Sequence, residues 1–315
     1  MQFSFKHFPS SRRVFRGVAV PTLAAVVLGA LLQPLPASAA PSADGTVTRV
    51  VDGDTIVASV GGVEERVRFL NIDTPEVGTC MADKATGFTS RQLPAGAPID
   101  LRYDRDLRDP YERLLALVKP QGSEWVSVSL AERGLGFPVS IAPNSTYYAR
   151  VVSAANRAKR TGAGMYSPKR SCTPVSRARR ANAMVTQAQG APVRSKAQYD
   201  AANRKLDQAL ALLALASASR YGVSSTYFGS YTKSLRVPVQ RRIRSVRAAK
   251  ARQWNIVRNQ QQNQQNQQNQ QDQQNNSDDN HTPSNSNNGW WPPGVPLSYT
   301  GPRCYEPGGV IWYPC

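Results

Sequence analysis

Two acidic motifs that flank a short hairpin pattern constrain this chain more than any other feature of its sequence. Asp52 and Asp54 precede one apolar-alternating segment, and Asp73 and Glu76 follow the next. A Gly-Gly pair at 61–62 separates the segments and supplies the positive φ that a two-residue hairpin turn needs. Folding of this hairpin brings Asp54 close to Asp73, although 19 residues separate them in the sequence.

A cation between the two carboxylates would offset their repulsion, and a hard divalent ion with oxygen ligands suits such a place. Each motif alone is explained equally well as a turn. Asp-Gly is a common turn dipeptide, and Asp-Thr-Pro-Glu is typical of a strand end that leads into a helix. A third polar group, Asp-Pro-Tyr-Glu-Arg at 109–113, lies at the start of another apolar run. The three groups together favour a functional site.

The spacing of apolar residues predicts five strands and three helices around these motifs. The last helix should end at Thr161-Gly162, because glycine is common just after a helix C-terminus. The expected strands are 46–51, 54–60, 63–71, 99–103 and 114–118, and the expected helices are 81–92, 126–133 and 145–160.

In their order and spacing, the motifs resemble the thermonuclease (staphylococcal nuclease-like) family. They are Asp-Gly-Asp-Thr at 52–55, Arg-x4-Asp-Thr-Pro-Glu at 68–76 and Asp-x-Tyr-x-Arg at 109–113. The resemblance implies an α+β fold, in which helices pack on a five-stranded OB-fold barrel. It also implies an endonuclease, a hydrolase of phosphodiester bonds that uses calcium. Such an enzyme would cleave DNA and RNA with little sequence specificity and leave 3′-phosphate ends.

The resemblance assigns the acidic residues to a calcium site and its water. Asp54, Asp73 and the backbone carbonyl of Thr74 would be calcium ligands, in a shell that water completes. Glu76 would hold or deprotonate the attacking water. Asp52 would brace the turn around the metal ligand.

The resemblance assigns the cationic side chains to the phosphate. Arg68 and Arg113 would bracket the scissile phosphate as catalytic residues, because guanidinium groups match phosphate oxygens bidentately and stabilise the charge of the transition state. Tyr111 would hydrogen-bond a phosphate of the bound nucleotide. The alternative for each arginine alone is a surface ion pair.

The chain departs from the family pattern at several positions of the nucleotide site. Glu112 stands where the family usually has glycine, and its carboxylate would repel substrate or draw Arg113 away. Pro110 replaces a basic residue. Val139 and Ile141 occupy positions that often carry aromatic rings, and the loss of a stacking platform costs about 1–3 kcal/mol. The tyrosines at 147–148 are placed to compensate.

The first 39 residues have the composition of a secretory signal peptide. Four basic residues and no acidic ones are followed by an apolar run and an Ala-x-Ala site, with cleavage expected after Ala39. The segment Ser11–Arg16 also resembles the twin-arginine signal. The apolar run is too short and too often interrupted for a membrane span, so no transmembrane segment is expected in the mature chain. A secreted, extracellular protein is predicted.

The four cysteines of the chain suit an oxidising exterior. Four cysteines allow three connectivities, of which the preferred one pairs Cys80 with Cys172 and Cys304 with Cys315. The first pair would tie the end of the nuclease-like domain to the loop after Glu76. No C-x-x-C motif is present, which argues against a structural zinc site.

The net charge of +18 is concentrated after the nuclease-like region. Residues 40–172 hold 17 Lys and Arg against 15 Asp and Glu, whereas residues 173–258 hold 17 against 2. Helical spacing at 199–216 and at 239–257, with breaks at Tyr221-Gly222 and near Pro238, predicts a helical hairpin or small bundle. This region is either a solvated spacer, an arm that binds nucleic acid, or an anchor to anionic cell-envelope polymers.

The sequence therefore predicts five parts. One of them, a Gln/Asn-rich linker, is expected to be disordered. Another, a short aromatic tail, would contact carbohydrate or a partner, or act as an end cap. The parts are the signal peptide 1–39, the nuclease-like domain 45–172, the basic helical extension 174–258, the disordered linker 259–289 and the disulfide-closed tail 290–315.

Two alternatives to the enzyme stay open at this point. One is a catalytically weak module that binds nucleic acid, and the other is an envelope-associated protein that binds polyanions. The retained acidic residues and arginines favour the enzyme. The sequence indicates no particular oligomeric state.

Overall fold

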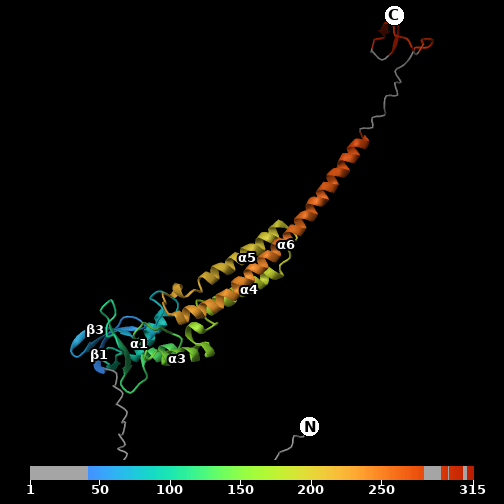
Figure 1. The fold of residues 1–315 in the computed structure, drawn as a ribbon. Helices are drawn as coiled ribbons and strands as arrows, with labels where there is room; N and C mark the ends of the chain where they lie inside the picture. Colours follow the sequence, from blue (N-terminus) through green and yellow to red (C-terminus); the bar gives the residue numbers. More distant parts are fainter. Residues whose placement is uncertain (1–41, 280–291, 297, 308–310) are drawn as a thin grey trace, which may run out of the picture. The chain divides into compact units, whose positions relative to one another are not determined.

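A closed five-stranded barrel forms the first part of the computed structural model, which describes residues 42–279, 292–296, 298–307 and 311–315 (Figure 1). Its order is β1-β2-β3-β6-β5, and β1 also pairs with β5. Strands β3 and β6 run parallel, which confirms a mixed barrel of the OB type. The strands are β1 (Ser42–Val50), β2 (Thr55–Val60), β3 (Val63–Phe69), β5 (Pro98–Arg102) and β6 (Leu114–Pro120).

The β2-β3 hairpin sets the register on which the acidic motifs depend. Val60 pairs with Val63 across Gly61 and Gly62, whose φ angles of 59° and 85° suit glycine. Thr55 therefore pairs with Arg68, so the residue before Thr55 lies beside the end of β3. Alternate residues of the hairpin point inward and are buried, among them Ile56, Ala58, Val67 and Phe69.

Three helices and a two-stranded ladder complete this domain. The ladder pairs β4 (Ile72–Asp73) with β7 (Phe137–Pro138), and the sequence did not predict it as separate strands. The last helix ends at Gly162, which has a φ of 68°, as expected for its C-terminal glycine. The helices are α1 (Ala82–Gln92), α2 (Val126–Glu132) and α3 (Tyr148–Thr161).

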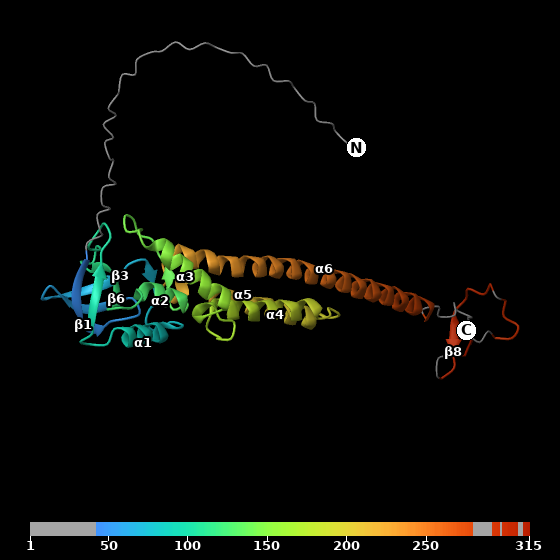
Figure 2. The ribbon, with the colours of Figure 1, turned by 90° about the horizontal axis from the view of Figure 1, so that it is seen from below.

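A three-helix bundle follows, with α4, α5 and α6 side by side and α6 running past the other two (Figure 2). This confirms that the C-terminal region is mostly helical. The elements are η1 (Gly164–Tyr166), α4 (Pro174–Gly190), α5 (Lys196–Ala214), η2 (Ala218–Tyr221) and α6 (Thr226–Asp279). Their shared core consists mainly of small and branched side chains, including Ala181, Val185, Leu206, Leu213, Ile243 and Val246.

Helix α6 differs from the sequence expectation in two ways. Pro238 lies inside the helix and does not end it, because the packing of Val239 and Ile243 in the bundle core offsets the missing backbone hydrogen bond. The helix also continues to Asp279, through much of the segment 259–289 that was expected to be disordered. Glutamine is a good helix former, and the side chains of residues 259–275 are all exposed.

A third cluster of buried residues joins the bundle to the barrel domain. Phe137 of β7 stacks on Phe228 of α6, with ring centroids 3.6 Å apart. Tyr166 and Tyr221 belong to the same cluster and are 3% and 1% exposed. The disulfide between Cys80 and Cys172, one of the two preferred pairs, lies at the same junction. The start of α6 is therefore packed into the nuclease-like domain.

The C-terminal residues form a small hairpin of β8 (Arg303–Tyr305) and β9 (Trp312–Pro314). The second preferred disulfide, between Cys304 and Cys315, closes it. The predicted signal peptide, as well as Trp290 and Trp291 of the tail, lies outside the described residues. Within the described part of the chain, no helix has the length and hydropathy needed to span a membrane.

Candidate active site

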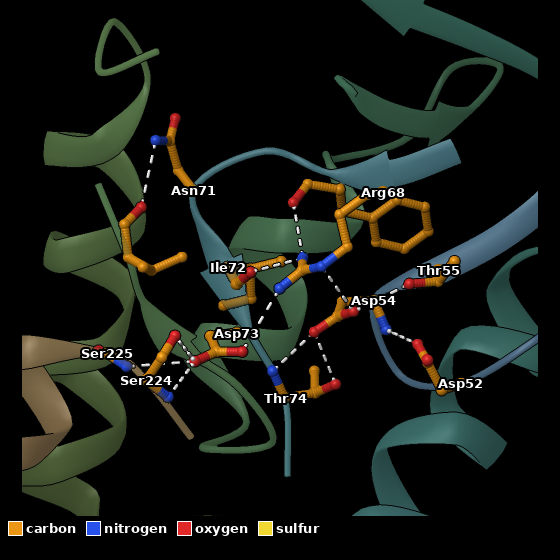
Figure 3. A network of polar contacts seen from close by, with 12 residues as sticks. Asp52, Asp54, Thr55, Arg68, Asn71, Ile72, Asp73, Thr74, Ser224 and Ser225 are labelled. Carbon is orange, nitrogen blue, oxygen red and sulfur yellow. Dashed lines mark hydrogen bonds and ion pairs between the residues drawn. The ribbon is translucent and has the colours of Figure 1, made fainter. Parts of the chain in front are cut away.

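The guanidinium group of Arg68 lies between the carboxylates of Asp54 and Asp73 (Figure 3). Its Nε atom is 3.2 Å from Asp54 Oδ1, and its Nη2 atom is 3.4 Å from Asp73 Oδ1. Nη1 donates to the carbonyls of Phe69 and Ile72 at 2.9 and 2.7 Å. The hairpin thus brings together the two aspartates that the motif spacing predicted to be neighbours, with an arginine supplying positive charge.

Asp54 is 5% exposed and accepts hydrogen bonds on both carboxylate oxygens. Its Oδ2 atom accepts from the backbone N–H and the hydroxyl of Thr74, at 2.7 and 2.8 Å. Its own N–H donates to Asp52 Oδ1 at 3.0 Å, so Asp52 closes the turn before β2. Burial, and then the charge of Asp54, raise the pKa of Asp52. This arrangement fits the bracing role expected of Asp52.

Asp73 is 6% exposed and lies in β4, held by the ladder with β7. Its Oδ2 atom accepts from the N–H and hydroxyl of Ser224 at 2.7 and 3.0 Å, and from the N–H of Ser225 at 3.2 Å. Burial raises the pKa of Asp73, although the charge of Arg68 and the Ser224 hydrogen bonds act against it.

Glu76 lies in the turn between β4 and α1 and is exposed. Burial, and then the charges of Asp54, Asp52 and Asp73, raise the pKa of Glu76 above its ordinary value. A carboxylate with a raised pKa is a stronger base than an ordinary glutamate. The position of Glu76 beside the two aspartates therefore suits proton transfer from a water molecule.

A cleft of about 850 Å³ connects these residues with the third motif. Arg68, Asp73 and Glu76 line one part of it, and Tyr111 and Arg113 line another. The single cleft shows that motifs more than 30 residues apart in sequence face a common space.

Arg113 is paired with Asp109, not with the adjacent Glu112. Its Nε and Nη2 atoms lie 2.7 and 2.6 Å from Asp109 Oδ2. Burial alone would raise the pKa of Asp109, but the hydrogen bonds from Arg113 and Tyr111 outweigh it and hold the pKa below its ordinary value. The Arg113 guanidinium also lies 5.5 Å from the centre of the Tyr111 ring, and Tyr111 is 80% exposed.

The departures from the family pattern shape the rest of the cleft. Pro110, Glu112, Val139 and Ile141 all line it, and Ile141 is 70% exposed. The tyrosines at 147–148 are not among the described residues that line the cleft.

The donor set at the centre of the site is suited to calcium. In the described part of the chain, no group of three or more His, Cys, Asp or Glu side chains could hold a metal ion. The site instead offers the carboxylate oxygens of Asp54 and Asp73, which in this structure accept hydrogen bonds and ion pairs from Thr74, Ser224 and Arg68. Calcium accepts an irregular shell of such hard oxygens and completes it with water, whereas zinc and softer metals prefer nitrogen and sulfur.

Sequence reasoning missed the part of the site that comes from the helical extension. Gly222 and Ser224 line the cleft, and Ser224 and Ser225 bind Asp73 from 151 and 152 residues away. From the sequence, the Tyr221-Gly222 pair was predicted only as a break between two helices. Its position at the active site depends on tertiary packing, which local patterns do not encode.

The closed barrel presents Asp73, Glu76 and two arginines to one cleft, and these residue types suit a phosphodiester hydrolase. The sequence profile of the family described as staphylococcal nuclease homologue matches residues 66–168. Over 120 residues the chain is 37% identical to the thermonuclease of Staphylococcus intermedius, which covers 36% of this chain and 70% of that protein. Over 127 residues it is 33% identical to the thermonuclease of Staphylococcus hyicus, and the matched region spans 38% of this chain and 74% of that protein.

Over 109 residues the chain is also 34% identical to the endonuclease YncB of Bacillus subtilis, covering 32% of this chain and 51% of that protein. The chain belongs to the staphylococcal nuclease homologues, and it is a nuclease.

Proposed function

We propose that the chain is an exported, calcium-dependent endonuclease that hydrolyses DNA and RNA with little sequence preference and leaves 3′-phosphate ends. The observation that carries this proposal is the shared cleft, which is lined by Arg68, Asp73, Glu76, Tyr111 and Arg113. These are the residue types that phosphodiester hydrolysis needs: carboxylates for a metal ion and for water, and guanidinium groups for phosphate oxygens.

The two arginines would bind the scissile phosphate from opposite parts of the cleft. Arg68 is 15% exposed and Arg113 is 24% exposed at the side chain, so both are partly shielded from water. In this structure Arg68 pairs with Asp54 and Asp73, and Arg113 pairs with Asp109. A bound phosphate would compete with these carboxylates for the guanidinium hydrogen bonds. The developing charge of the transition state would strengthen these bonds, which is the source of catalysis. Tyr111, exposed at the rim, would donate its hydroxyl to a neighbouring phosphate.

Glu76 would orient the attacking water and accept its proton. Its pKa is raised above the ordinary value for glutamate. A general base is most efficient when its pKa lies near the working pH, so this shift favours proton transfer from water. Calcium held by Asp54, Asp73 and the Thr74 carbonyl would supply a fixed positive charge that stabilises the phosphate in the transition state. Asp54 directly precedes β2, and Asp73 lies in β4, so strand pairing fixes the backbone beside both aspartates.

Export and substrate range are supported by features outside the cleft. The two disulfides are stable in an oxidising compartment, and the first 39 residues have the composition of a signal peptide. Val139 and Ile141, at positions that the resemblance assigns to the nucleotide site, are apolar, line the cleft and offer no side-chain hydrogen bonds to base edges. Little sequence preference follows.

The test is digestion of plasmid, single-stranded DNA and RNA by the chain, with calcium or with a chelator. Glu76→Gln should lower the cleavage rate by at least about 100-fold, because the base is removed while the shape is kept. Arg113→Ala should lower it by a similar factor, because one stabilising guanidinium is removed. Labelling of the product ends should show a 3′-phosphate and a 5′-hydroxyl.

Arg157→Ala is the matched control. Arg157 pairs with Glu132 on the surface between α3 and α2, so this change removes an ion pair without touching the cleft. Cleavage within twofold of wild type is expected for it. Nucleic-acid binding without cleavage by the wild-type chain would refute the enzyme and support a binding module.

A second function, polyanion binding by the bundle, is favoured by a separate observation. Residues 173–258 carry 17 Lys and Arg against 2 Asp and Glu. Eleven of the basic side chains are exposed: Arg179, Arg180, Arg194, Lys196, Arg204, Arg220, Lys233, Arg241, Arg244, Arg252 and Arg258. Such a surface would bind long nucleic acids by counterion release, or anionic polymers of a cell envelope.

A further inference from the structure

The turn between η2 and α6, residues 221–225, touches both Asp73 and Glu76. It belongs to the helical extension and lies outside residues 66–168, which match the nuclease family. We call it the site turn. It makes backbone and side-chain hydrogen bonds to one acidic residue and packs closely on the other.

The site turn fixes one oxygen of the Asp73 carboxylate. Three donors, the N–H and hydroxyl of Ser224 and the N–H of Ser225, converge on Asp73 Oδ2 at 2.7–3.2 Å. A carboxylate oxygen has two lone-pair directions, so Oδ2 is saturated and Oδ1 is left toward Arg68. Ser225 directly precedes α6, whose N-terminal dipole favours a negative charge at this point.

The site turn also forms the packing surface behind Glu76. The backbone N–H of Glu76 donates to the carbonyl of Tyr221 at 2.9 Å. Gly222 has a φ of 68°, and a Cβ atom added there would lie 2.1 Å from Glu76 Cγ and 2.6 Å from Glu76 Cβ. Only glycine therefore leaves Glu76 in its observed position.

The site turn is anchored on both sides. Tyr221 is buried, and its hydroxyl donates to the carbonyl of Cys172 at 3.0 Å. On the other side, the Ser225 hydroxyl donates to the carbonyl of Pro138, and Phe228 stacks on Phe137. The contacts with Pro138 and Phe137 fix the turn to β7, the strand that pairs with β4, which contains Asp73.

We propose that the site turn is a built-in part of the catalytic site, with Ser224 and Ser225 positioning Asp73 for the cation and Gly222 positioning Glu76. The inference rests on the proposed function and extends it, because it makes the helical extension a contributor to the nuclease site. The nuclease-like domain, residues 45–172, then supplies an incomplete site on its own.

The hydrogen bonds to Asp73 are tested by calcium binding in the full chain, measured by calorimetry with calcium chloride and no substrate. Ser224→Ala removes the hydroxyl donor and leaves the two backbone N–H donors, so Asp73 Oδ2 is held less firmly and calcium binding should weaken at least threefold. Ser224→Thr keeps the hydroxyl and should restore binding. Ser234→Ala, whose hydroxyl bonds only within α6, is the control and should bind calcium as wild type does. Wild-type affinity in Ser224→Ala would overturn this part of the proposal.

The packing on Glu76 is tested by a matched pair of glycine variants. Gly222→Ala and Gly162→Ala both place alanine at a φ of 68°, but near Gly162 the closest atoms are 3.8 Å away. Gly222→Ala should lower kcat at least tenfold with KM changed less than threefold, while Gly162→Ala should stay within twofold of wild type. Equal kcat values in the two variants would overturn the assignment of Gly222.

The two proposals fail in different ways. A wild-type chain that cleaves no nucleic acid would refute the nuclease function, while calcium affinity in Ser224→Ala would still test the positioning of Asp73. A wild-type chain that cleaves, with both site-turn variants equally active, would refute only the role of the turn.

Discussion

Glu112 adopts a left-handed backbone conformation with a φ of 59°, between Tyr111 and Arg113. Residues with a Cβ atom are strained there, by about 1–2 kcal/mol, and glycine is not. This explains why the family resemblance places glycine at the position. The carboxylate of Glu112 is exposed, and the partner of Arg113 is Asp109. The main consequence of Glu112 is therefore backbone strain, not capture of Arg113.

Glu112→Gly should raise the free energy of unfolding by about 0.5–1 kcal/mol, since the relief of strain exceeds the entropy that glycine adds to the unfolded chain. Urea denaturation checks this. Glu112→Ala is the matched control, because it removes the carboxylate and keeps the Cβ atom. An equal gain in both variants would show that the charge, and not the backbone, is the cause.

At the residue level, the sequence was informative where function depends on neighbours along the chain. Asp54 and Asp73 lie on one hairpin and its continuation, so spacing and alternation were enough to predict them as neighbours, whereas the place of Arg68 between them was not predicted. The contact of Ser224 with Asp73 was not predicted, because it joins residues that are far apart in the sequence. Its hydrogen bond to Asp73 spans 151 residues and depends on the packing of Phe228 against Phe137, which no local pattern contains.

At the level of elements, α6 shows how packing overrides local signals. Pro238 predicted a break, yet Leu235 before it and Val239, Ile243 and Val246 after it pack against the same core. The partner helix α4 was not predicted as a separate element, because its buried face is mostly alanine and carries little hydrophobic signal. The barrel strands, with alternating valine, isoleucine and leucine, gave a much stronger signal.

A buried lysine links α6 to the end of α4. Lys250 is 3% exposed, and its Nζ atom donates to the carbonyls of Gln189 and Ala191 and to the side chain of Gln253. These carbonyls lie at the C-terminal end of α4, where a positive charge is favourable. Burial lowers the pKa of Lys250, although its ammonium group is hydrogen-bonded to both carbonyls.

Lys250→Met should lower the free energy of unfolding by about 2 kcal/mol, because two partly buried carbonyls would be left without their charged donor. Lys233→Met, on the exposed face of the same helix, is the control and should change it by less than about 0.5 kcal/mol. Urea denaturation followed by circular dichroism measures both. A decrease of similar size in the two variants would mean that the hydrogen bonds of Lys250 are not the cause.

At the scale of the whole molecule, the chain combines a nearly neutral nuclease domain with a strongly basic bundle. The acidic residues and arginines of the candidate site lie in the former, and α6 begins directly after the site turn and carries exposed arginines away from it. This arrangement suits an enzyme whose chemistry and substrate retention are separate. Retention by charge should depend on the length of the substrate and on salt, whereas cleavage at the site should not.

Replacement of Arg241, Arg244 and Arg252 by Gln should raise KM for long DNA at least fivefold and leave KM for a short oligonucleotide within twofold. The slope of log binding constant against log salt should fall in magnitude by about 0.9 for each phosphate that the bundle no longer neutralises. The matched control replaces Arg49, Lys84 and Arg91, three exposed basic residues of the barrel domain, by Gln and removes the same charge. If affinity falls equally in both triple variants, net charge and not the bundle surface retains the substrate.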